Sequence, residues 1–183
     1  PIDDCPNIAK YLKPFKDKLS QKRETQKGLI PWYSLHWPRK KGLFETQKIL
    51  LRQTSDTLIC TYDEDNNYVL NSIIVIVLGN EYKNLSFYII GLLNSKLMRY
   101  IYRQITQESG RVFPEVKPVN IRKLPIIIPE SKKDRLLMEK INILTMELRI
   151  NYSREKKIEL DEIVFDLYDI TENERKTIES VNQ

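Results

Sequence analysis

The spacing of apolar residues changes near residue 86, and this change limits the possible folds more than any other feature of the chain. Before it, the segments 48–53, 57–62 and 68–78 are rich in Ile, Leu, Val, Tyr and Thr, which favour β-strands. After it, apolar residues recur every three or four positions, which is typical of one face of an α-helix. The sequence therefore predicts an α+β fold in which strands precede most of the helices.

A turn-forming run, Asp63-Glu64-Asp65-Asn66-Asn67, separates the second and third strand segments, so we expect these two to pair as a β-hairpin. Residues 71–77 are apolar on both faces, which indicates a buried or central strand. We expect a short helix at 16–27 and a longer one at 86–106 that begins with Ser86 as its N-cap. The sheet should be twisted and mostly antiparallel, with the longer helix packed on it.

The chain is helical in pattern from Ser131 onward. Ser131 and Asp134 have the spacing of a capping box. An apolar seam with the spacing of a coiled coil follows at Leu137, Ile141, Leu144 and Leu148. The segment 154–168 repeats this pattern, and we expect Ile158 and Val164 to face inward and Asp161 and Glu162 outward. Thr171 and Glu174 predict a second capping box and a last short helix.

These helices should form an antiparallel hairpin that packs on the sheet or on a partner. We place a boundary near Pro129. It separates a first domain at 1–129 from a helical support or assembly region at 130–183.

Charge is distributed unevenly along the chain. The whole sequence has 30 Lys and Arg against 25 Asp and Glu, a formal net charge of +5. Residues 10–52 hold twelve basic and three acidic residues, a difference of +9, whereas residues 153–183 hold five and nine, a difference of −4. Because a basic segment favours a polyanionic partner, we expect nucleic-acid contact in the first half of the chain.

The cysteines and the hydropathy exclude several other classes of protein. Cys5 and Cys60 lack zinc-motif spacing, and with a single histidine the chain has no zinc ligand set, so we expect two free thiols in a reducing compartment. The longest apolar run, 73–78, is far shorter than the roughly 20 residues of a membrane helix. No signal peptide opens the sequence. We expect a cytoplasmic protein that forms part of a larger chain.

Several short motifs occur in a recognisable order along nearly the whole chain. They are Tyr11-Leu12-Lys13-Pro14-Phe15, Pro31-Trp32-Tyr33-Ser34-Leu35, Trp37-Pro38-Arg39, Gly91-Leu92-Leu93-Asn94-Ser95-Lys96-Leu97, Lys123-Leu124-Pro125-Ile126 and the tail from Leu160 to Glu172. Each motif alone is weak. The ordered set resembles the TaqI-like C-terminal specificity domain, and it is also similar to type I specificity subunits. Asp169 stands where that family often has glycine.

This resemblance implies a target-recognition module of an adenine-N6 DNA methyltransferase or of a fused type II restriction-modification enzyme, and it makes residues 1–129 the DNA target-recognition domain. The implied partners are double-stranded DNA and the methyltransferase or nuclease domains of the parent, which would bind S-adenosylmethionine and, for a nuclease, Mg²⁺. The chain itself lacks the Asn/Asp-Pro-Pro-Tyr/Phe motif and a glycine-rich loop for that cofactor. Glu45-x-x-Lys48 comes nearest to a nuclease motif, and its lysine is better explained as the start of a strand. We expect neither catalysis nor a cofactor in this chain.

Residues of two kinds are expected at a DNA interface. Cations near turns neutralise backbone phosphates, and an aromatic loop lies beside them; the candidates are Lys10, Lys13, Arg23, His36, Arg39, Lys40 and Lys41. Arginine reads guanine and glutamine reads adenine in the major groove; the candidate base readers are Arg52, Gln53 and Arg111.

Other interpretations of these residues stay open. The cations can instead form a solvated surface, and Trp32 or Trp37 can anchor its loop in the core. Asn94 and Ser95 are expected to serve helix packing or capping rather than DNA contact. A second function is also consistent with the sequence, in which the C-terminal hairpin docks onto the methyltransferase part of the parent as an assembly module.

Overall fold

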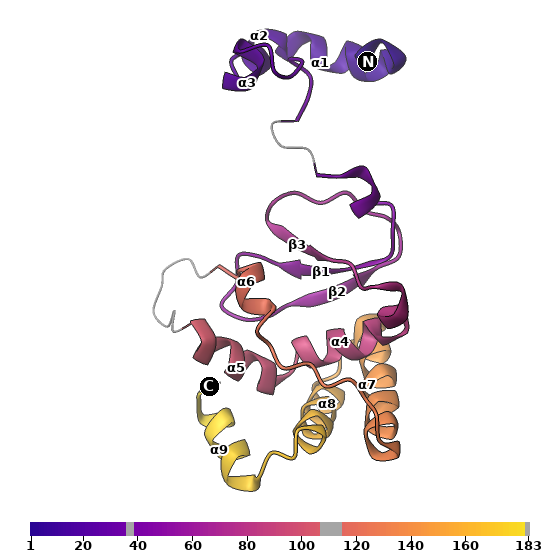
Figure 1. The fold of residues 1–183 in the computed structure, drawn as a ribbon, viewed down its shortest axis with the longest axis vertical. Coiled ribbons are helices and arrows are strands. Elements are labelled where there is room, and N and C mark those ends of the chain that lie inside the picture. Colours follow the sequence, from indigo (N-terminus) through magenta and orange to yellow (C-terminus); the bar gives the residue numbers. More distant parts are fainter. Residues whose placement is uncertain (36–38, 107–114, 182–183) are drawn as a thin grey trace. The chain divides into compact units, whose positions relative to one another are not determined.

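The computed structural model describes residues 1–35, 39–106 and 115–181, and it divides the chain into two compact units, Pro1–Lys41 and Gly42–Gln183. The first unit consists of short helices joined by turns (Figure 1). They are η1 (Ile2–Asp4), α1 (Pro6–Leu12), η2 (Lys13–Phe15), α2 (Lys16–Ser20) and α3 (Arg23–Gln26). None of them contains a buried residue.

The single helix expected at 16–27 is therefore wrong in detail, because an extended residue divides it. Lys22 has φ −59° and ψ 133° and separates α2 from α3. Its ammonium group donates hydrogen bonds to the carbonyl oxygens of Trp32 (2.9 Å) and Ser34 (2.5 Å). The break between α2 and α3 therefore coincides with a tertiary contact of Lys22, which helix propensity alone does not predict.

The second unit contains a three-stranded antiparallel sheet of β1 (Lys48–Arg52), β2 (Cys60–Asp63) and β3 (Ile73–Ile76), in the order β2-β1-β3. Leu50 lies opposite Thr61 on one side and Val75 on the other. The expected hairpin between the second and third strands is wrong, since both pair with β1. The run 63–67 is instead a local turn held by the Asp63 carboxylate, which accepts hydrogen bonds from the main chain of Asp65 and Asn67.

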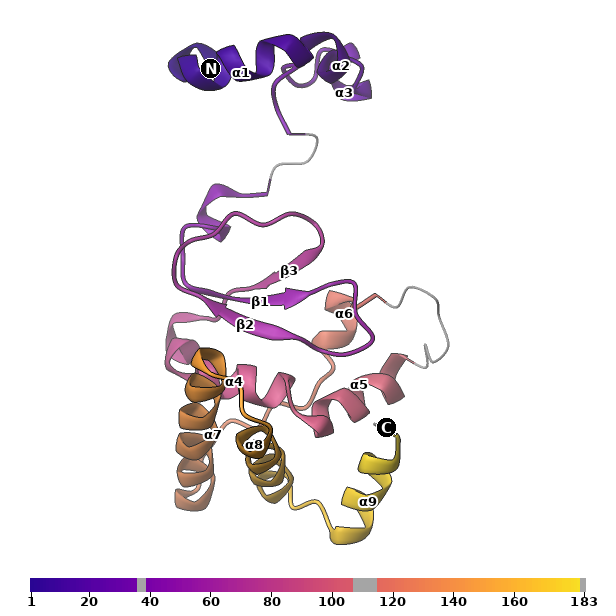
Figure 2. The ribbon, with the colours of Figure 1, turned by 180° about the vertical axis from the view of Figure 1, so that it is seen from behind.

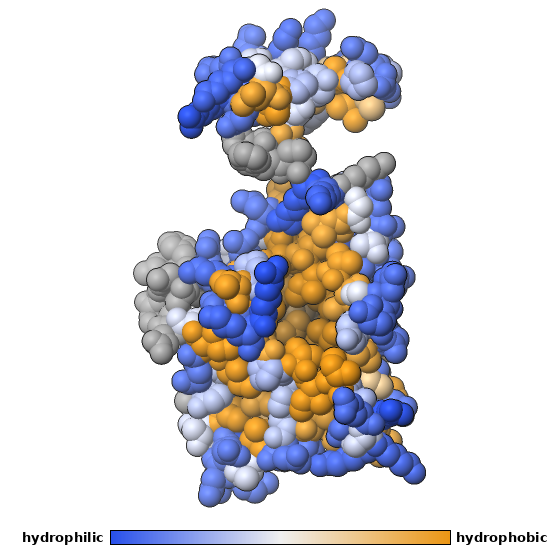
Figure 3. Space-filling model, in the orientation of Figure 1, coloured by the Kyte–Doolittle hydropathy of each residue, from blue (hydrophilic) through white to orange (hydrophobic). Residues whose placement is uncertain are grey.

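The third strand lies at an edge of the sheet. All four residues of β3 are half-buried, and Val77 beyond them is exposed. The expectation of a buried or central strand at 71–77 is therefore wrong, and β1 takes the central place. Apolar side chains show at the surface over this part of the sheet (Figure 3).

The remaining elements of this unit are helical. They are η3 (Lys41–Leu43), η4 (Asn80–Leu85), α4 (Ser86–Leu93), α5 (Lys96–Thr106), α6 (Pro118–Ile121), α7 (Lys132–Ile150), α8 (Arg154–Leu167) and α9 (Glu172–Val181). The helix expected at 86–106 is divided into α4 and α5. Ser86 is not its N-cap, because its hydroxyl donates to the Lys83 carbonyl (2.7 Å) inside the preceding 3-10 helix.

The helices α4, α7 and α8 form two layers on one side of the sheet. The helix α4 lies between the sheet and the hairpin of α7 and α8, in both the front and the back view (Figures 1 and 2). One hydrophobic core joins all three layers, and it includes Leu51 of β1, Leu92 of α4, Ile141 of α7 and Val164 of α8. None of the described helices combines the length and apolar composition that a bilayer span requires.

The structure confirms most of the pattern predicted for the C-terminal hairpin. Ser131 and Asp134 form both hydrogen bonds of the capping box that begins α7. The seam residues Ile141 and Leu144 are buried, and Leu137 and Leu148 pack against the same core. The Thr171 main chain donates to the Glu174 carboxylate before α9 (2.8 Å).

Two expectations for α8 fail, and both concern which face of the helix points inward. Ile158 is exposed, whereas Asp161 is almost fully buried. Val164 is buried, as expected.

The compact unit of residues 42–183 spans both sides of Pro129, because α7 and α8 share a core with the sheet and α4. The functional division between 1–129 and 130–183 stays a prediction about roles.

Gly91 of α4 permits the close approach of α7. A Cβ atom at this position would meet the Thr145 hydroxyl and would lie 2.6 Å from Cγ2 of Ile141. Both neighbours are buried, so neither can easily move. The α4–α7 packing therefore depends on the missing side chain.

We expect Gly91→Ala to lower the free energy of unfolding by about 2 kcal/mol. Contacts this close to buried atoms put the cost of overpacking at the upper end of its usual range of about 1–3 kcal/mol, and the better helix propensity of alanine returns about 1 kcal/mol. Urea unfolding of the full chain measures the change. Gly42→Ala is the control, because no atom lies within 4 Å of its added Cβ. Equal stability of the two variants would contradict the packing account.

Candidate nucleic-acid interface

The predicted phosphate contacts of the first unit include cations on three different helices. Lys10 of α1, Lys13 of η2 and Arg23 of α3 are all exposed. No ion pair within the described part of the chain engages them. Their charges are therefore accessible to a polyanion, and their role as phosphate contacts stays a prediction.

The aromatic loop that follows is anchored by lysines rather than by burial in a core. Besides the two hydrogen bonds from Lys22, the ammonium of Lys16 lies 5.9 Å from the centre of the Trp32 ring. Trp32 and Tyr33 meet edge to face with ring centres 5.7 Å apart, and both are half-buried. Lys16 and Lys22 thus have a structural role, because their contacts hold this loop against the helices of the first unit.

The central cationic cluster of the prediction is described only in part. Arg39 is half-buried and already takes part in an interaction, whereas Lys40 is exposed. His36, Arg111 and the side chain of Lys41 lie outside the described residues. For these positions the assignment stays a prediction.

Arg52 and Gln53 come at the end of β1, and successive side chains of an extended chain point to opposite faces. Ile49 and Leu51 face the core, so Arg52 belongs to the other face of the sheet and is exposed. Gln53 is half-buried, and its main chain bonds to Ser72 on one side and to Val116 on the other. Arg52 is consequently the freer of the two to reach a base.

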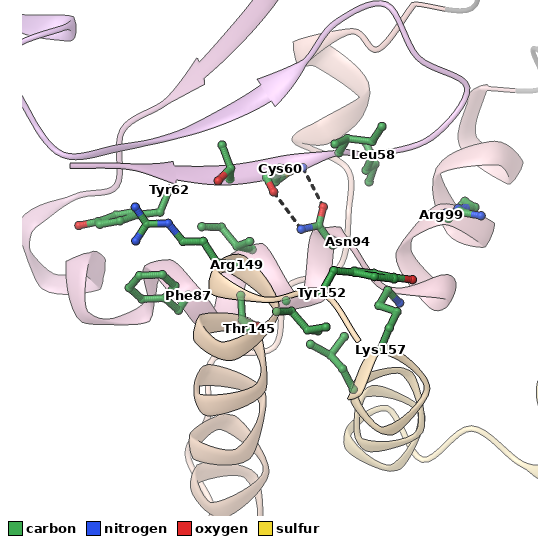
Figure 4. Close-up of a pocket in the computed structure, with 16 residues that line it drawn as sticks. Leu58, Cys60, Tyr62, Phe87, Asn94, Arg99, Thr145, Arg149, Tyr152 and Lys157 are labelled. Carbon is green, nitrogen blue, oxygen red and sulfur yellow. Dashed lines mark hydrogen bonds between the residues drawn. The ribbon is translucent and has the colours of Figure 1, made fainter. Parts of the chain in front are cut away.

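A cavity of about 420 Å³ lies between β2 and the helices of the second unit. Its walls include Tyr62 of β2, Phe87 and Asn94 at the two ends of α4, and Tyr152 between α7 and α8 (Figure 4). Three cations also line it, Arg99, Arg149 and Lys157. The sequence analysis singled out none of them, because they come from three separate helices and form no cluster in the sequence.

Arg149 occupies the end of the cavity near Tyr62. Its guanidinium group pairs with the Glu64 carboxylate (2.7 Å) and lies 6.0 Å from the ring centres of Tyr62 and Phe87. An ion pair and two aromatic rings therefore hold this arginine in place.

Lys157 lies at the other end, paired with Asp161 (2.5 Å). Burial lowers the pKa of Lys157, and the charges of Arg99 and Lys96 lower it further, against the raising effect of Asp161. Asp161 also accepts a hydrogen bond from the main-chain N–H of Lys96 at the start of α5 (2.8 Å). The outward orientation expected for Asp161 is wrong because this carboxylate caps another helix.

Asn94 joins the helices to the sheet at the wall of the cavity. The hydrogen bond from Arg52 N–H to the Ile59 carbonyl directs the polar groups of the next residue, Cys60, away from β1. The Asn94 amide accepts from Cys60 N–H (2.7 Å) and donates to the Cys60 carbonyl (3.0 Å) (Figure 4). Asn94 therefore has the structural role expected of it, as does Ser95, whose hydroxyl accepts from Met98 N–H (3.2 Å).

The segment that comes nearest to a nuclease motif, Glu45-x-x-Lys48, has a structural explanation in the burial of its lysine. Lys48, the first residue of β1, has a fully buried side chain that pairs with Asp63 (2.5 Å) and donates to the Phe44 carbonyl (2.8 Å). Burial raises the pKa of Asp63, but hydrogen bonds from Lys48 and Asn67 and the Lys48 charge outweigh it, so this pKa lies below its ordinary value. Lys48 thus joins β1 to β2, and the interpretation of its position as a strand start is confirmed.

Comparison with known protein families matches residues 4–126 to the TaqI-like C-terminal specificity domain. The chain belongs to this family. The match includes the basic segment of residues 10–52 and the Gly91–Leu97 motif, and it ends before α7. A candidate type II restriction enzyme and methyltransferase of Methanocaldococcus jannaschii is 28% identical over 124 residues, which cover 64% of this chain and 10% of that protein. This specificity domain thus spans about a tenth of the length of that relative.

The contact between Asn94 and the sheet edge gives a direct test of the site's architecture. We expect Asn94→Leu to lower the free energy of unfolding by about 1–3 kcal/mol, since two buried main-chain groups would lose their partners. Hydrogen exchange measured by NMR should show loss of protection at the Cys60 amide. The Arg52 amide is the internal control, because the Ile59 carbonyl still accepts from it. An unchanged Cys60 amide would contradict the assigned role.

Proposed function

We propose that this specificity domain recognises a duplex DNA sequence on behalf of a restriction-modification enzyme. The observation that carries the proposal is the family match over residues 4–126, because it includes the segment in which basic residues exceed acidic ones by nine. A cationic segment supplies the sequence-independent part of DNA affinity through phosphate contacts. Side chains that reach base edges supply the specificity.

Within this proposal the residues have two roles. Lys10, Lys13, Arg23 and Lys40, which are exposed, contact phosphates together with Arg39, Lys41 and His36. Arg52 reads a base from the open face of the sheet, and Gln53 and Arg111 belong to the same set of base readers.

Catalysis belongs to other domains of the parent protein in this account. A specificity domain is not itself catalytic. No group of three potential metal ligands occurs among the described His, Cys, Asp and Glu residues. We infer that the parent is an adenine-N6 methyltransferase, with S-adenosylmethionine and, where a nuclease is present, Mg²⁺ bound outside this chain.

The phosphate role is tested by replacing Arg39, Lys40 and Lys41 together with alanine. Fluorescence anisotropy with a DNA duplex, repeated over a series of salt concentrations, measures affinity and its salt dependence. We expect weaker binding and a log K against log salt slope that is smaller by about three, since each lost phosphate contact removes roughly one from the slope.

The matched control removes the same charge elsewhere, at Lys132, Arg135 and Lys140, which are exposed on α7. This variant should keep most of the affinity. A wild-type chain that binds no duplex at low salt, or two triple variants with the same slope, would overturn the proposal.

A second function, assembly with the methyltransferase part of the parent, is favoured by an unpartnered stripe on α7. The seam first expected to serve it is buried inside the domain. Four other apolar residues, spaced by seven, three and four, remain exposed: Leu136, Ile143, Met146 and Ile150. This spacing is typical of a helix that packs against another helix.

Truncation at Pro129 cannot separate the two functions, since it would remove the part of the hydrophobic core that α7 and α8 supply, including Ile141 and Val164. We expect the double variant Ile143→Glu and Ile150→Glu to bind a separately produced methyltransferase domain of the parent at least tenfold more weakly while its DNA affinity is unchanged. Calorimetric titration measures the first and anisotropy the second. Leu70→Glu, at an exposed apolar position outside the stripe, is the control. Undiminished binding of the double variant would exclude the stripe as the docking surface.

A further inference from the structure

Arg99 of α5 differs from the other arginines near the cavity because nothing in the described part of the chain neutralises it. Arg149 pairs with Glu64 and Arg103 lies 3.9 Å from Asp56. The guanidinium group of Arg99 has no carboxylate partner among the described residues, and its Nε atom is buried without a hydrogen-bond acceptor. Buried donors without an acceptor are rare in native proteins, and a bound ion is one explanation of such an atom.

The charges beside Arg99 leave a positive excess at this end of the cavity. Lys157 pairs with Asp161 (2.5 Å), and Lys96 pairs with Glu179 (2.7 Å). Among the described residues, these groups amount to three cations and two carboxylates. Asp161 accepts from Lys157 through one oxygen and from the main chain of Lys96 through the other, and within the described residues it forms no ion pair with Arg99.

The electrostatics of Lys157 favour an anion at this end of the cavity. Burial lowers its pKa, and the charges of Arg99 and Lys96 act in the same direction. An anion in the cavity would offset this repulsion and accept the unused hydrogen bond of Arg99. The cavity has room for one, since about 420 Å³ lies within the range of roughly 300–1,000 Å³ that is common for ligand pockets.

We propose that Arg99 and Lys157 bind a phosphate group at this end of the cavity (Figure 4). The planar guanidinium fork of arginine matches two phosphate oxygens, and a lysine ammonium adds a point charge. Tyr152 is exposed beside Lys157 and offers a ring surface to whatever carries the phosphate. The phosphate comes either from the DNA backbone or from a free nucleotide. The site itself does not depend on the DNA-recognition function, because free phosphate can occupy it.

The first experiment titrates the full 183-residue chain with inorganic phosphate and with AMP in a calorimeter. Arg99→Met removes the unpaired buried donor, so we expect this variant to fold with an unchanged or higher Tm. It should bind both ligands at least tenfold more weakly than the wild type. Lys157→Gln should also weaken binding, while its amide can still donate to Asp161. Arg103→Met, on the same helix, should bind as the wild type does.

The second experiment distinguishes the two sources of phosphate by measuring duplex binding of the same variants over a salt series. If the DNA backbone is the source, Arg99→Met lowers duplex affinity and reduces the salt slope by about one, whereas Arg103→Met does not. If a free nucleotide is the source, Arg99→Met leaves duplex binding unchanged and weakens only the binding of phosphate and AMP. Both outcomes support the site.

The proposal is overturned if phosphate, AMP and duplex all bind independently of Arg99, or if none of them binds. The two proposals also fail separately. A chain that binds AMP through Arg99 but binds no duplex would contradict DNA recognition and leave the phosphate site established.

Discussion

The hydrogen bonds between the Asn94 amide and the main chain of Cys60 hold the helical layers to the edge of the sheet, and the rest of the second unit is arranged around them. Asn94 stands where α4 ends and α5 begins. On one side of it, Gly91 admits α7, and on the other, the main chain of Lys96 bonds to Asp161 of α8. The motif by which the family is recognised in this segment is thus a structural junction. It shapes the cavity and supports the sheet that carries Arg52.

Local pattern predicted those features that depend on local physics. The capping box of Ser131, the seam of α7 and the strand positions follow from side-chain spacing and hydrogen bonding within a few residues. Strand pairing was predicted wrongly because Leu50 of β1 has partners on both sides, and no local signal states which strand is central. The outward orientation of Asp161 was also predicted wrongly. Helical periodicity shows that a charged residue lies on the helix, but it does not show that its carboxylate accepts from the Lys96 N–H, 65 residues away.

The same distinction between local pattern and tertiary packing applies to the candidate site. The exposed cations of the first unit could be predicted because a run of like charges is visible in the sequence. The cationic cavity could not, since Arg99, Arg149 and Lys157 come together only when α5, α7 and α8 pack against β2. Buried lysines illustrate the difference as well: Lys48 lies within the basic segment, yet its charge is used inside the sheet against Asp63. Net charge therefore predicts which segment carries a cationic surface, and packing determines which of its side chains remain exposed to bind a polyanion.

The central claim is that this specificity domain selects a DNA sequence and does not merely bind polyanions. Selection from a library of duplexes with a randomised central segment, followed by sequencing of the bound fraction, tests it most directly. The account predicts enrichment of one short common sequence by the wild-type chain, and loss of that enrichment in Arg52→Ala at positions contacted by this side chain. A bound fraction as random as the input would contradict it.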